Sequence, residues 1–293
     1  MKPRHLLLSL GLTLFSAAAA AANSLLIFAG AATVPPTTEA ARAFEKKTGV
    51  KIDVVFGGSG YVLSQMKLAK QGDLYFPGSS DSMEVAKREG FVLPESEKIV
   101  VYVVPAINVQ KGNPHGIKGL KDLLKPGLRV VIANPEGVCV GAYAVEIFEK
   151  ELTPAEREQL KANIRNYTGS CEQTATAISL KLADAVVGWR VFQYWDPDRI
   201  ETVKLPAAQI PRIGYIPIAI SKYSKNPKLA QRFIDFVTGP EGQAIYAKYS
   251  YFADPEAAFK WLGAVKPVGG EYVVPKEWLN LRATVAPKKV VKP

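Results

Sequence analysis

Short apolar runs alternate along the chain with longer amphipathic segments. The first run, Leu25–Ala29, is continuously apolar, which is typical of a strand buried on both faces of a parallel sheet. Small residues and the Pro35-Pro36 pair follow it and predict a helix over 39–47. The order then repeats, with a strand over 51–56 and, after three glycines and a serine, a helix over 61–70. Two helices therefore begin just after strands that we expect to be neighbours.

The alternation continues along the rest of the chain and predicts an α/β protein. Asp81, with Glu84 three residues later, predicts the N-cap of one helix. Thr153, with Pro154 and Glu156 after it, predicts the N-cap of another. Further strands are expected over 73–76, 129–133, 185–189, 201–204 and 212–220, and further helices over 81–89, 117–124, 142–150, 153–164, 172–182, 228–238, 240–248 and 255–262.

The segment 98–110 is long, rich in β-branched residues and interrupted by Pro105. It is long enough to leave one lobe and enter another, and the proline favours a bend there. A second α/β pattern follows, and we expect the strand over 212–220 to bring the chain back to the first lobe. We therefore expect two doubly wound α/β lobes with a hinge and an interlobe ligand cleft. The expected division is a signal peptide over 1–22, lobe 1 over 23–105 and 212–293, and lobe 2 over 106–211.

The first 22 residues have the three parts of a secretory signal. Lys2 and Arg4 form a basic start, a mostly apolar stretch follows, and a run of small residues ends the segment. The apolar stretch is too short and too rich in alanine for a membrane-spanning helix. We therefore expect cleavage near Ala22 and an exported, periplasmic protein.

The chain has 37 Lys and Arg against 27 Asp and Glu, a formal net charge of +10, of which about +8 remains after removal of the signal. The basic residues are scattered over predicted helices and the tail at 288–292. They form no stripe that alternates with aromatic residues, so we expect a solvated basic surface and no nucleic-acid partner. In an exported protein the excess can still attract an anion.

Cys139 and Cys171 are the two cysteines of the chain. Export permits a disulfide, and two cysteines are the minimum that closes one. A bridge across this spacing would stabilise the protein by about 3–4 kcal/mol in the chain-entropy model. The alternative is a pair of free, packed thiols. Two thiols with almost no histidine make a poor metal site.

Few residues point to catalysis. The mature chain has one histidine, His115, in a predicted loop. Ser59 lies outside any G-x-S-x-G motif because Tyr61 stands where the second glycine belongs. A dinucleotide fingerprint fails because Leu63 replaces its third glycine, and there is no P-loop. We therefore expect no enzyme, no cofactor and no resident metal; an exported hydrolase that uses Ser59 is the remote alternative.

With catalytic motifs excluded, the predicted helix N-termini are the remaining candidates for a binding site. A helix N-terminus presents unpaired N–H groups and a partial positive charge, so several such termini at strand ends can hold an anion without enzyme chemistry. Each predicted lobe offers two of them. Glu136 and Glu172 lie at or near predicted helix starts, and we interpret both as complementing helix dipoles rather than as ligand contacts.

A series of motifs supports this interpretation through their order and spacing between Leu25 and Phe252. They are Phe28–Ala32, Phe44–Val50, Phe56–Gly60, Asn134–Val138, Val140–Tyr143, Ala183–Trp189, Ser224–Pro227, Phe233–Phe236 and Gly239–Gln243. Together they resemble the periplasmic molybdate- and tungstate-binding proteins of ABC importers, which are class II periplasmic solute-binding proteins. The tail from about Asp254 lies outside the resemblance.

The resemblance implies that a tetrahedral oxyanion, molybdate or tungstate, binds between the lobes through backbone N–H groups and hydroxyls. Val140 and Cys171 would contribute backbone N–H groups, and a bridge between Cys139 and Cys171 would brace the site. It also implies a membrane permease as partner, and we expect a monomer. The oxyanion contacts carried over by local match are Ala32, Thr33, Ser59, Gly60, Val140, Cys171 and Trp189.

Two positions depart from the family pattern. The family usually has a serine where this chain has Ala32, so Thr33 replaces the hydroxyl or one contact is lost. It usually has a tyrosine where this chain has Trp189, whose indole N–H donates with a different reach. Trp189 as plain core, and Ser59 and Thr33 as ordinary N-caps, are the structural alternatives.

Other solutes stay open as alternatives, namely sulfate, phosphate or ferric iron. Tyr246, Tyr249 and Tyr251 suggest a phenolate iron site, but we interpret them as packing near a helix end. The sequence does not rank molybdate against tungstate, because the two anions are nearly equal in size and charge.

Overall fold

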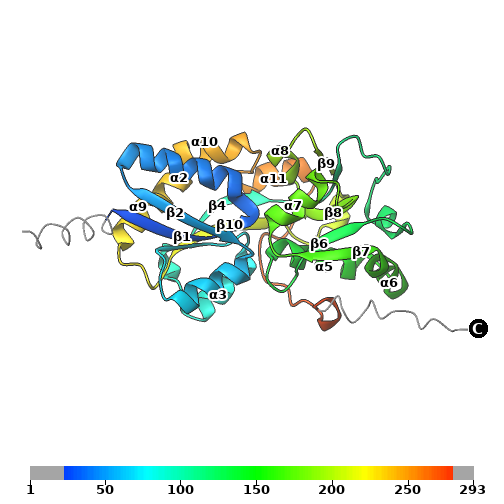
Figure 1. The fold of residues 1–293 in the computed structure, drawn as a ribbon, viewed down its shortest axis with the longest axis horizontal. Coiled ribbons are helices and arrows are strands. Elements are labelled where there is room, and N and C mark those ends of the chain that lie inside the picture. The colour runs from blue at the N-terminus through cyan, green and yellow to red at the C-terminus, as the bar shows by residue number, and fades with distance from the viewer. Residues whose placement is uncertain (1–22, 280–293) are drawn as a thin grey trace, which may run out of the picture.

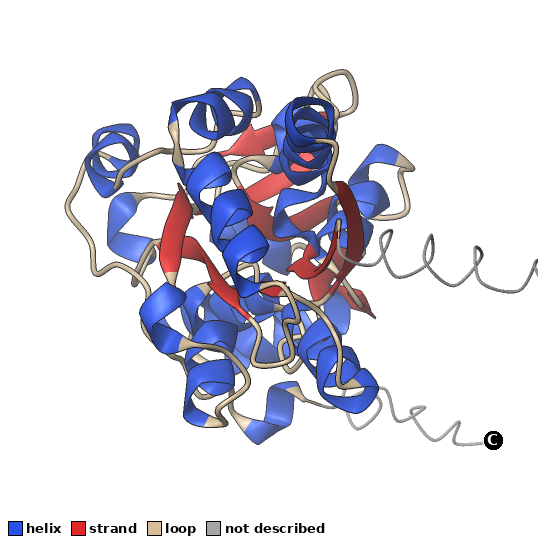
Figure 2. Cartoon of the chain, turned by 90° about the vertical axis from the view of Figure 1, so that its left-hand side faces the viewer, coloured by secondary structure: helices blue, strands red, loops and turns tan. Residues whose placement is uncertain are grey.

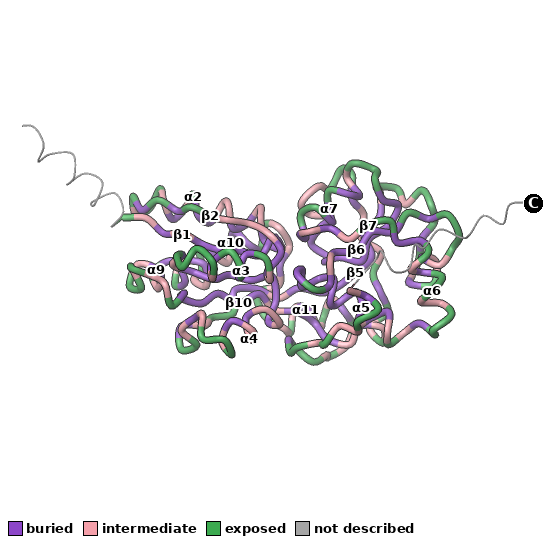
Figure 3. The backbone as a smooth tube through the Cα atoms, turned by 60° about the horizontal axis from the view of Figure 1, so that its bottom comes forward, coloured by how far each residue is buried: buried purple, intermediate pink, exposed green. Residues whose placement is uncertain are grey.

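The computed structural model describes residues 23–279, and within them the chain forms two lobes, each built on a five-stranded mixed sheet (Figure 1). Helices flank both sheets (Figure 2), and the buried residues follow the strands of each lobe (Figure 3). The predicted two-lobed α/β fold is confirmed. The predicted signal peptide over 1–22 lies outside the described residues. None of the helices described is long and apolar enough to cross a membrane.

The first sheet has the order β2-β1-β3-β10-β4. β1 and β2 are parallel and in register from Ser24 opposite Lys51 to Gly30 opposite Gly57, so both strands end at the same edge. The helices that follow them therefore begin side by side. The elements of this lobe are β1 (Ser24–Gly30), α2 (Val34–Thr48), β2 (Lys51–Gly57), α3 (Ser59–Ala69), β3 (Leu74–Phe76), α4 (Ser80–Arg88), β4 (Lys98–Val103), β10 (Gly214–Ile220), α9 (Pro227–Thr238) and α10 (Pro240–Lys248).

The second sheet has the order β7-β6-β8-β5-β9. β6 is parallel to both β7 and β8, so α5 and α7, which follow β6 and β7, begin at one edge of this sheet. The elements of this lobe are β5 (Pro105–Gln110), β6 (Val130–Ala133), α5 (Cys139–Glu151), α6 (Pro154–Asn163), β7 (Ile164–Thr168), α7 (Cys171–Ser179), β8 (Ala185–Trp189), α8 (Phe192–Trp195) and β9 (Ile200–Val203).

Several local predictions are corrected. Asp81 is not an N-cap, because α4 begins one residue earlier behind Ser79. The segment predicted as a helix over 117–124 forms a short 3₁₀ helix, Leu120–Leu124. β7 and α8 were not predicted. The capping box at Thr153 is confirmed, with its side chain accepting a hydrogen bond from the Glu156 N–H.

The chain passes between the lobes at Val104, which separates β4 from β5, and again through residues 204–213. After α10 it enters α11 (Pro255–Leu262), whose Ala258 and Leu262 pack in the core of the second sheet. Trp278 joins the same core. The exact lobe boundaries stay a prediction.

Candidate functional site

The N-terminus of α3 lies against the loops that precede α5 and α7. The Gly60 N–H donates to the Gly137 carbonyl at 3.0 Å, a backbone hydrogen bond between lobes. A Cβ atom on Gly58 would lie 2.7 Å from the Gly137 oxygen and 2.8 Å from the Gly169 oxygen. The first turns of three helices, from both lobes, therefore converge on one place.

Ser59 is the first residue of α3, and its side chain faces this junction. Gly58 is the N-cap of the helix, so Ser59 is not an ordinary capping residue. Its Oγ accepts a hydrogen bond from the Gly78 N–H at 2.9 Å and donates to the Cys139 Sγ at 3.8 Å. The side chain thus connects a first-lobe turn with the start of α5 in the second lobe.

Cys139 and Cys171 are the first residues of α5 and α7, and both are buried. Both thiols are free in the structure, so the expected disulfide is not formed there, and their pairing stays a prediction. The hydrogen bond from the Cys171 thiol lowers the pKa of Cys139, against the effect of burial, and Ser59 adds to this lowering. The same interaction, together with burial, raises the pKa of Cys171 well above its usual value. Cys139 therefore ionises first.

Val140 and Trp189 complete the second-lobe side of the junction, and neither is exposed. The Trp189 ring meets Tyr143 edge to face, with ring centroids 4.9 Å apart. Its Nε1 lies near the Cys171 thiol, yet among residues 23–279 it has no hydrogen-bond acceptor. A buried donor without a partner costs about 1–3 kcal/mol. The indole N–H of Trp189 is thus a buried donor beside the Cys171 thiol, and its contact with an oxyanion stays a prediction.

Ala32 and Thr33 lie in the short turn after β1, and both are buried. The Ala32 carbonyl accepts a hydrogen bond from the Tyr251 hydroxyl. The Thr33 hydroxyl accepts one from Thr37 at 2.9 Å, and Thr37 also bonds to Tyr246. Thr33 makes no capping bond to α2, so this network, rather than N-capping, engages its hydroxyl.

The tyrosines near the end of α10 are packing residues in the structure. Tyr246 and Tyr251 are buried, with ring centroids 5.9 Å apart. Burial raises the pKa of both phenols, which disfavours the phenolate form that iron would need. Within residues 23–279 no group of three or more His, Cys, Asp or Glu is placed to hold a metal ion.

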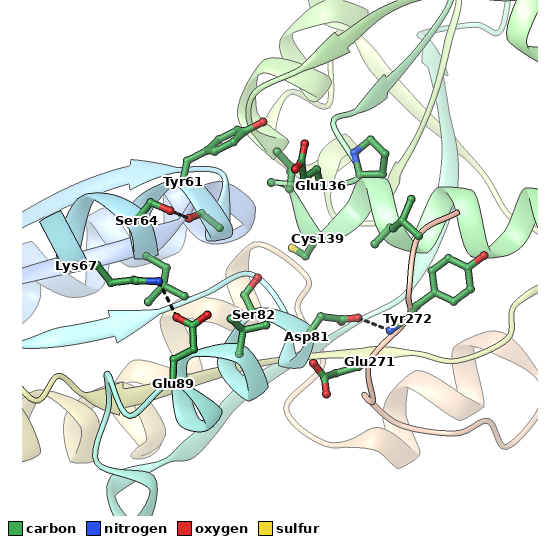
Figure 4. A pocket seen from close by; sticks show the side chains of 18 residues that line it. Tyr61, Ser64, Lys67, Asp81, Ser82, Glu89, Glu136, Cys139, Glu271 and Tyr272 are labelled. Carbon is green, nitrogen blue, oxygen red and sulfur yellow. Dashed lines mark hydrogen bonds and ion pairs between the residues drawn. The ribbon is translucent and has the colours of Figure 1, made fainter. Parts of the chain in front are cut away.

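A cleft of about 530 Å³ opens beside the junction (Figure 4). Tyr61 and Lys67 of α3 line one side of it, and Glu136 and Cys139 lie across from them. Of the predicted oxyanion contacts, Gly60 lines this cleft, and the other six are buried. The structure thus brings Ser59, Gly60, Val140, Cys171 and Trp189 to the meeting place of the lobes, with Ala32 and Thr33 in the turn after β1.

His115, the one histidine of the predicted mature chain, does not lie at the junction. It is an exposed loop residue of the second lobe, and its Nε2 is 3.2 Å from Asp184. Ser59 bonds instead to a backbone N–H and a thiol, so the described residues do not pair it with an imidazole base.

One buried residue near the junction was missed by the sequence analysis. Arg212 pairs with Asp81 of α4 and with Glu146 of α5, both at 2.8 Å. Its cation also lies over the Tyr143 ring, 3.9 Å from the centroid. These partners are far from it along the chain, so no local pattern could have indicated the cluster.

Comparison with known proteins finds binding proteins, both among family models and among individual relatives. The family described as bacterial extracellular solute-binding protein matches residues 25–252. A binding protein of Haemophilus influenzae is 29% identical over 211 residues, which cover 72% of this chain and 81% of the relative. The molybdate-binding protein ModA of Mycobacterium bovis is 25% identical over 213 residues, covering 71% of this chain and 75% of the relative.

Among solved structures, the sulfate-binding protein SubI of Mycobacterium tuberculosis superimposes with a TM-score of 0.71 at 18% identity. The match covers 84% of this chain and 93% of that structure. At this identity the likeness concerns the two-lobed fold. Because the family match spans most of the chain, this protein belongs to the bacterial extracellular solute-binding proteins, the solute-binding components of ABC importers.

Proposed function

We propose that this protein captures a tetrahedral oxyanion, molybdate or tungstate, for ABC import. The observation that carries the proposal is the convergence of the α3, α5 and α7 N-termini at Ser59, Cys139 and Cys171. The relative from Mycobacterium bovis, named a molybdate-binding protein, supports the choice of ligand. The proposed contacts are those carried over from the sequence: Ala32, Thr33, Ser59, Gly60, Val140, Cys171 and Trp189.

Binding in this proposal needs no lysine or arginine at the anion. Each helix N-terminus contributes an effective charge of roughly +0.5, so several together offset a dianion. Contact between the lobes excludes water and strengthens these hydrogen bonds. A site made of donors also rejects an anion that keeps a proton, because that proton finds no acceptor.

The same proposal covers location and partners. The signal sequence supports cleavage near Ala22 and a periplasmic protein. It acts as a monomer that delivers its ligand to a membrane permease, with neither a cofactor nor a catalytic step. A nucleic-acid partner is not part of the proposal, since the basic residues are scattered.

The test is a panel of molybdate, tungstate, sulfate and phosphate in thermal-shift and calorimetric titrations of the purified mature protein. We expect molybdate or tungstate to bind with a Kd of about 1 μM or tighter. A 1,000-fold excess over Kd then stabilises the fold by about 4 kcal/mol. Absence of heat and of thermal stabilisation with both anions would contradict the proposal.

Ser59→Ala is the matched variant for this test. Loss of a hydrogen bond to a charged ligand costs about 1.5–3 kcal/mol, so we expect binding to weaken by roughly 10- to 100-fold. Ser24→Ala is the control, because Ser24 begins β1 at the end of the strand away from the junction. Equal affinity of the two variants would remove Ser59 from the site.

Sulfate is the second candidate ligand, supported by the fold shared with SubI. The same donor set suits any tetrahedral dianion, so the panel decides by rank order. Stronger stabilisation by sulfate than by molybdate at equal concentration would assign the protein to sulfate.

Binding is expected to weaken at alkaline pH because of Cys139. Its lowered pKa means that the thiolate forms at a lower pH than for a free cysteine, and this adds a negative charge beside the anion. We expect affinity to fall by about tenfold as pH rises through that pKa. Calorimetry between pH 7 and 9 in the presence of a reductant measures the effect.

Two cysteine substitutions control the pH experiment. Cys139→Ser removes the titrating group and should flatten the profile. Cys171→Ala removes the hydrogen-bond donor that is the main cause of the lowered pKa of Cys139, so the loss of affinity should move to higher pH. A wild-type profile that Cys139→Ser leaves unchanged would show that another group is responsible.

A further inference from the structure

After α11, residues 267–278 run back between the two lobes (Figure 1). We call this segment the strap. The family match ends at residue 252, so the strap lies beyond it. The strap begins beside the second interlobe crossing, where the Ile213 N–H donates to the Pro267 carbonyl at 2.9 Å and the Gly269 N–H donates to the Ile213 carbonyl at 2.8 Å.

The strap is bound to the first lobe through α4. The Ser80 hydroxyl donates to the Gly270 carbonyl at 3.1 Å. The Tyr272 N–H donates to the Asp81 carboxylate at 3.2 Å, as Figure 4 shows. Glu271 pairs with Arg88 at 3.0 Å. Three successive strap residues therefore hold one helix of the first lobe.

The end of the strap is anchored in the second lobe. Trp278 is fully buried, and its ring lies 5.5 Å from that of Phe148 between centroids. Its Nε1 donates to Glu149 of α5 at 2.7 Å, and the Lys161 ammonium lies 4.8 Å from the ring centroid. The strap thus reaches from α4 of one lobe to α5 and α6 of the other.

Arg212 joins the strap to both lobes at one point. It is 5% exposed and bonds to Asp81 of the first lobe and Glu146 of the second. It also donates to the Gly269 and Gly270 carbonyls of the strap, at 3.3 and 2.7 Å. Both glycines have positive φ, +67° and +93°, a conformation that other residues rarely adopt. Separating the lobes would leave at least one of these buried charges without its partner.

We propose that the strap and Arg212 form an interlobe latch that holds the lobes closed and slows release of the bound solute. Arg212 is a positioning residue, since it acts through α4, α5 and the strap rather than on the ligand. The latch shifts the open–closed equilibrium toward the closed state before any ligand binds. Its effect on release rests on the proposed function, whereas its effect on lobe closure does not.

Small-angle scattering of the mature protein without added anion tests the latch directly. The double variant Asp81→Asn with Glu271→Gln removes two acidic partners of the latch and keeps the side-chain shapes. We expect a larger radius of gyration than for the wild type, and a return to the wild-type value on addition of the anion that binds. The dissociation rate constant of that anion should rise by about tenfold or more.

The control is Asp196→Asn with Arg199→Gln, which removes an ion pair within the second lobe. It should leave the radius of gyration and the dissociation rate unchanged. Arg212→Met is a second latch variant, judged only if its circular dichroism shows a folded protein. An anion-free double variant that is folded and as compact as the wild type would overturn the latch. A larger radius with no response to any oxyanion would preserve the latch and reject the proposed ligand.

Discussion

Replacement of Gly58 by valine is expected to abolish oxyanion binding while the protein stays folded. Gly58 has φ −61° and ψ 139°, a conformation that any residue adopts, so the change introduces no backbone strain. The Cβ atom would instead lie within 2.8 Å of the carbonyl oxygens of Gly137 and Gly169, which belong to the opposite lobe. The Cβ atom would also lie 2.8 Å from a ring carbon of Tyr61 in α3, but that side chain is 39% exposed and has room to move. The two carbonyl oxygens are backbone atoms of the opposite lobe, so the new side chain acts mainly as a wedge against lobe closure.

Calorimetry and scattering measure this result. We expect at least a 100-fold loss of affinity for the anion that the wild type binds, because closing against a wedge costs about 3 kcal/mol or more. The radius of gyration should also increase. Gly60→Ala is a graded comparison, since its Cβ would lie 3.4 Å from the nearest atom, and it should cost at most a few-fold.

Gly119→Val is the control for the wedge. Gly119 is extended, with φ −178°, and a Cβ there meets no atom within 4 Å. It should bind as the wild type does. Wild-type affinity of Gly58→Val would mean that binding does not require the contact between α3 and the loops before α5 and α7.

Trp189→Phe is expected to weaken binding by roughly 10- to 100-fold, because it removes a buried N–H donor that has no acceptor among residues 23–279. If Trp189 were plain core, the substitution would lower stability and leave the affinity unchanged. The two effects separate when Kd is measured by calorimetry well below the melting temperature of the variant.

Trp189→Tyr distinguishes the loss of the hydrogen-bond donor from the change in the size of the aromatic ring. A tyrosine restores a hydroxyl donor with a shorter reach, and it is the residue type that the family resemblance implies at this position. We expect it to recover part of the affinity lost in Trp189→Phe. Trp261→Phe, a partly buried tryptophan at the end of α11, is the control and should bind normally. Equal affinity of Trp189→Phe and the wild type would show that Trp189 is a core residue that does not contact the anion.

The sequence predicted most strands and helices because their signals are local. The apolar run of β1 and the capping box at Thr153 depend on residues a few positions apart, and both are found in the structure. The start of α5 was predicted too late, at Ala142 rather than Cys139. Its first turn has no side-chain cap, so the usual start signal is missing.

By itself, then, the sequence determined the two-lobed α/β fold, the family and the loops from which helices begin. The tertiary structure alone decided which groups meet: Ser59 with Cys139, Trp189 without an acceptor, and Arg212 between α4, α5 and the strap. Arg212 and Asp81 are 131 positions apart. Helical and strand periodicity act over a few residues, whereas contacts at such separation depend on how the two lobes dock, which no local pattern encodes.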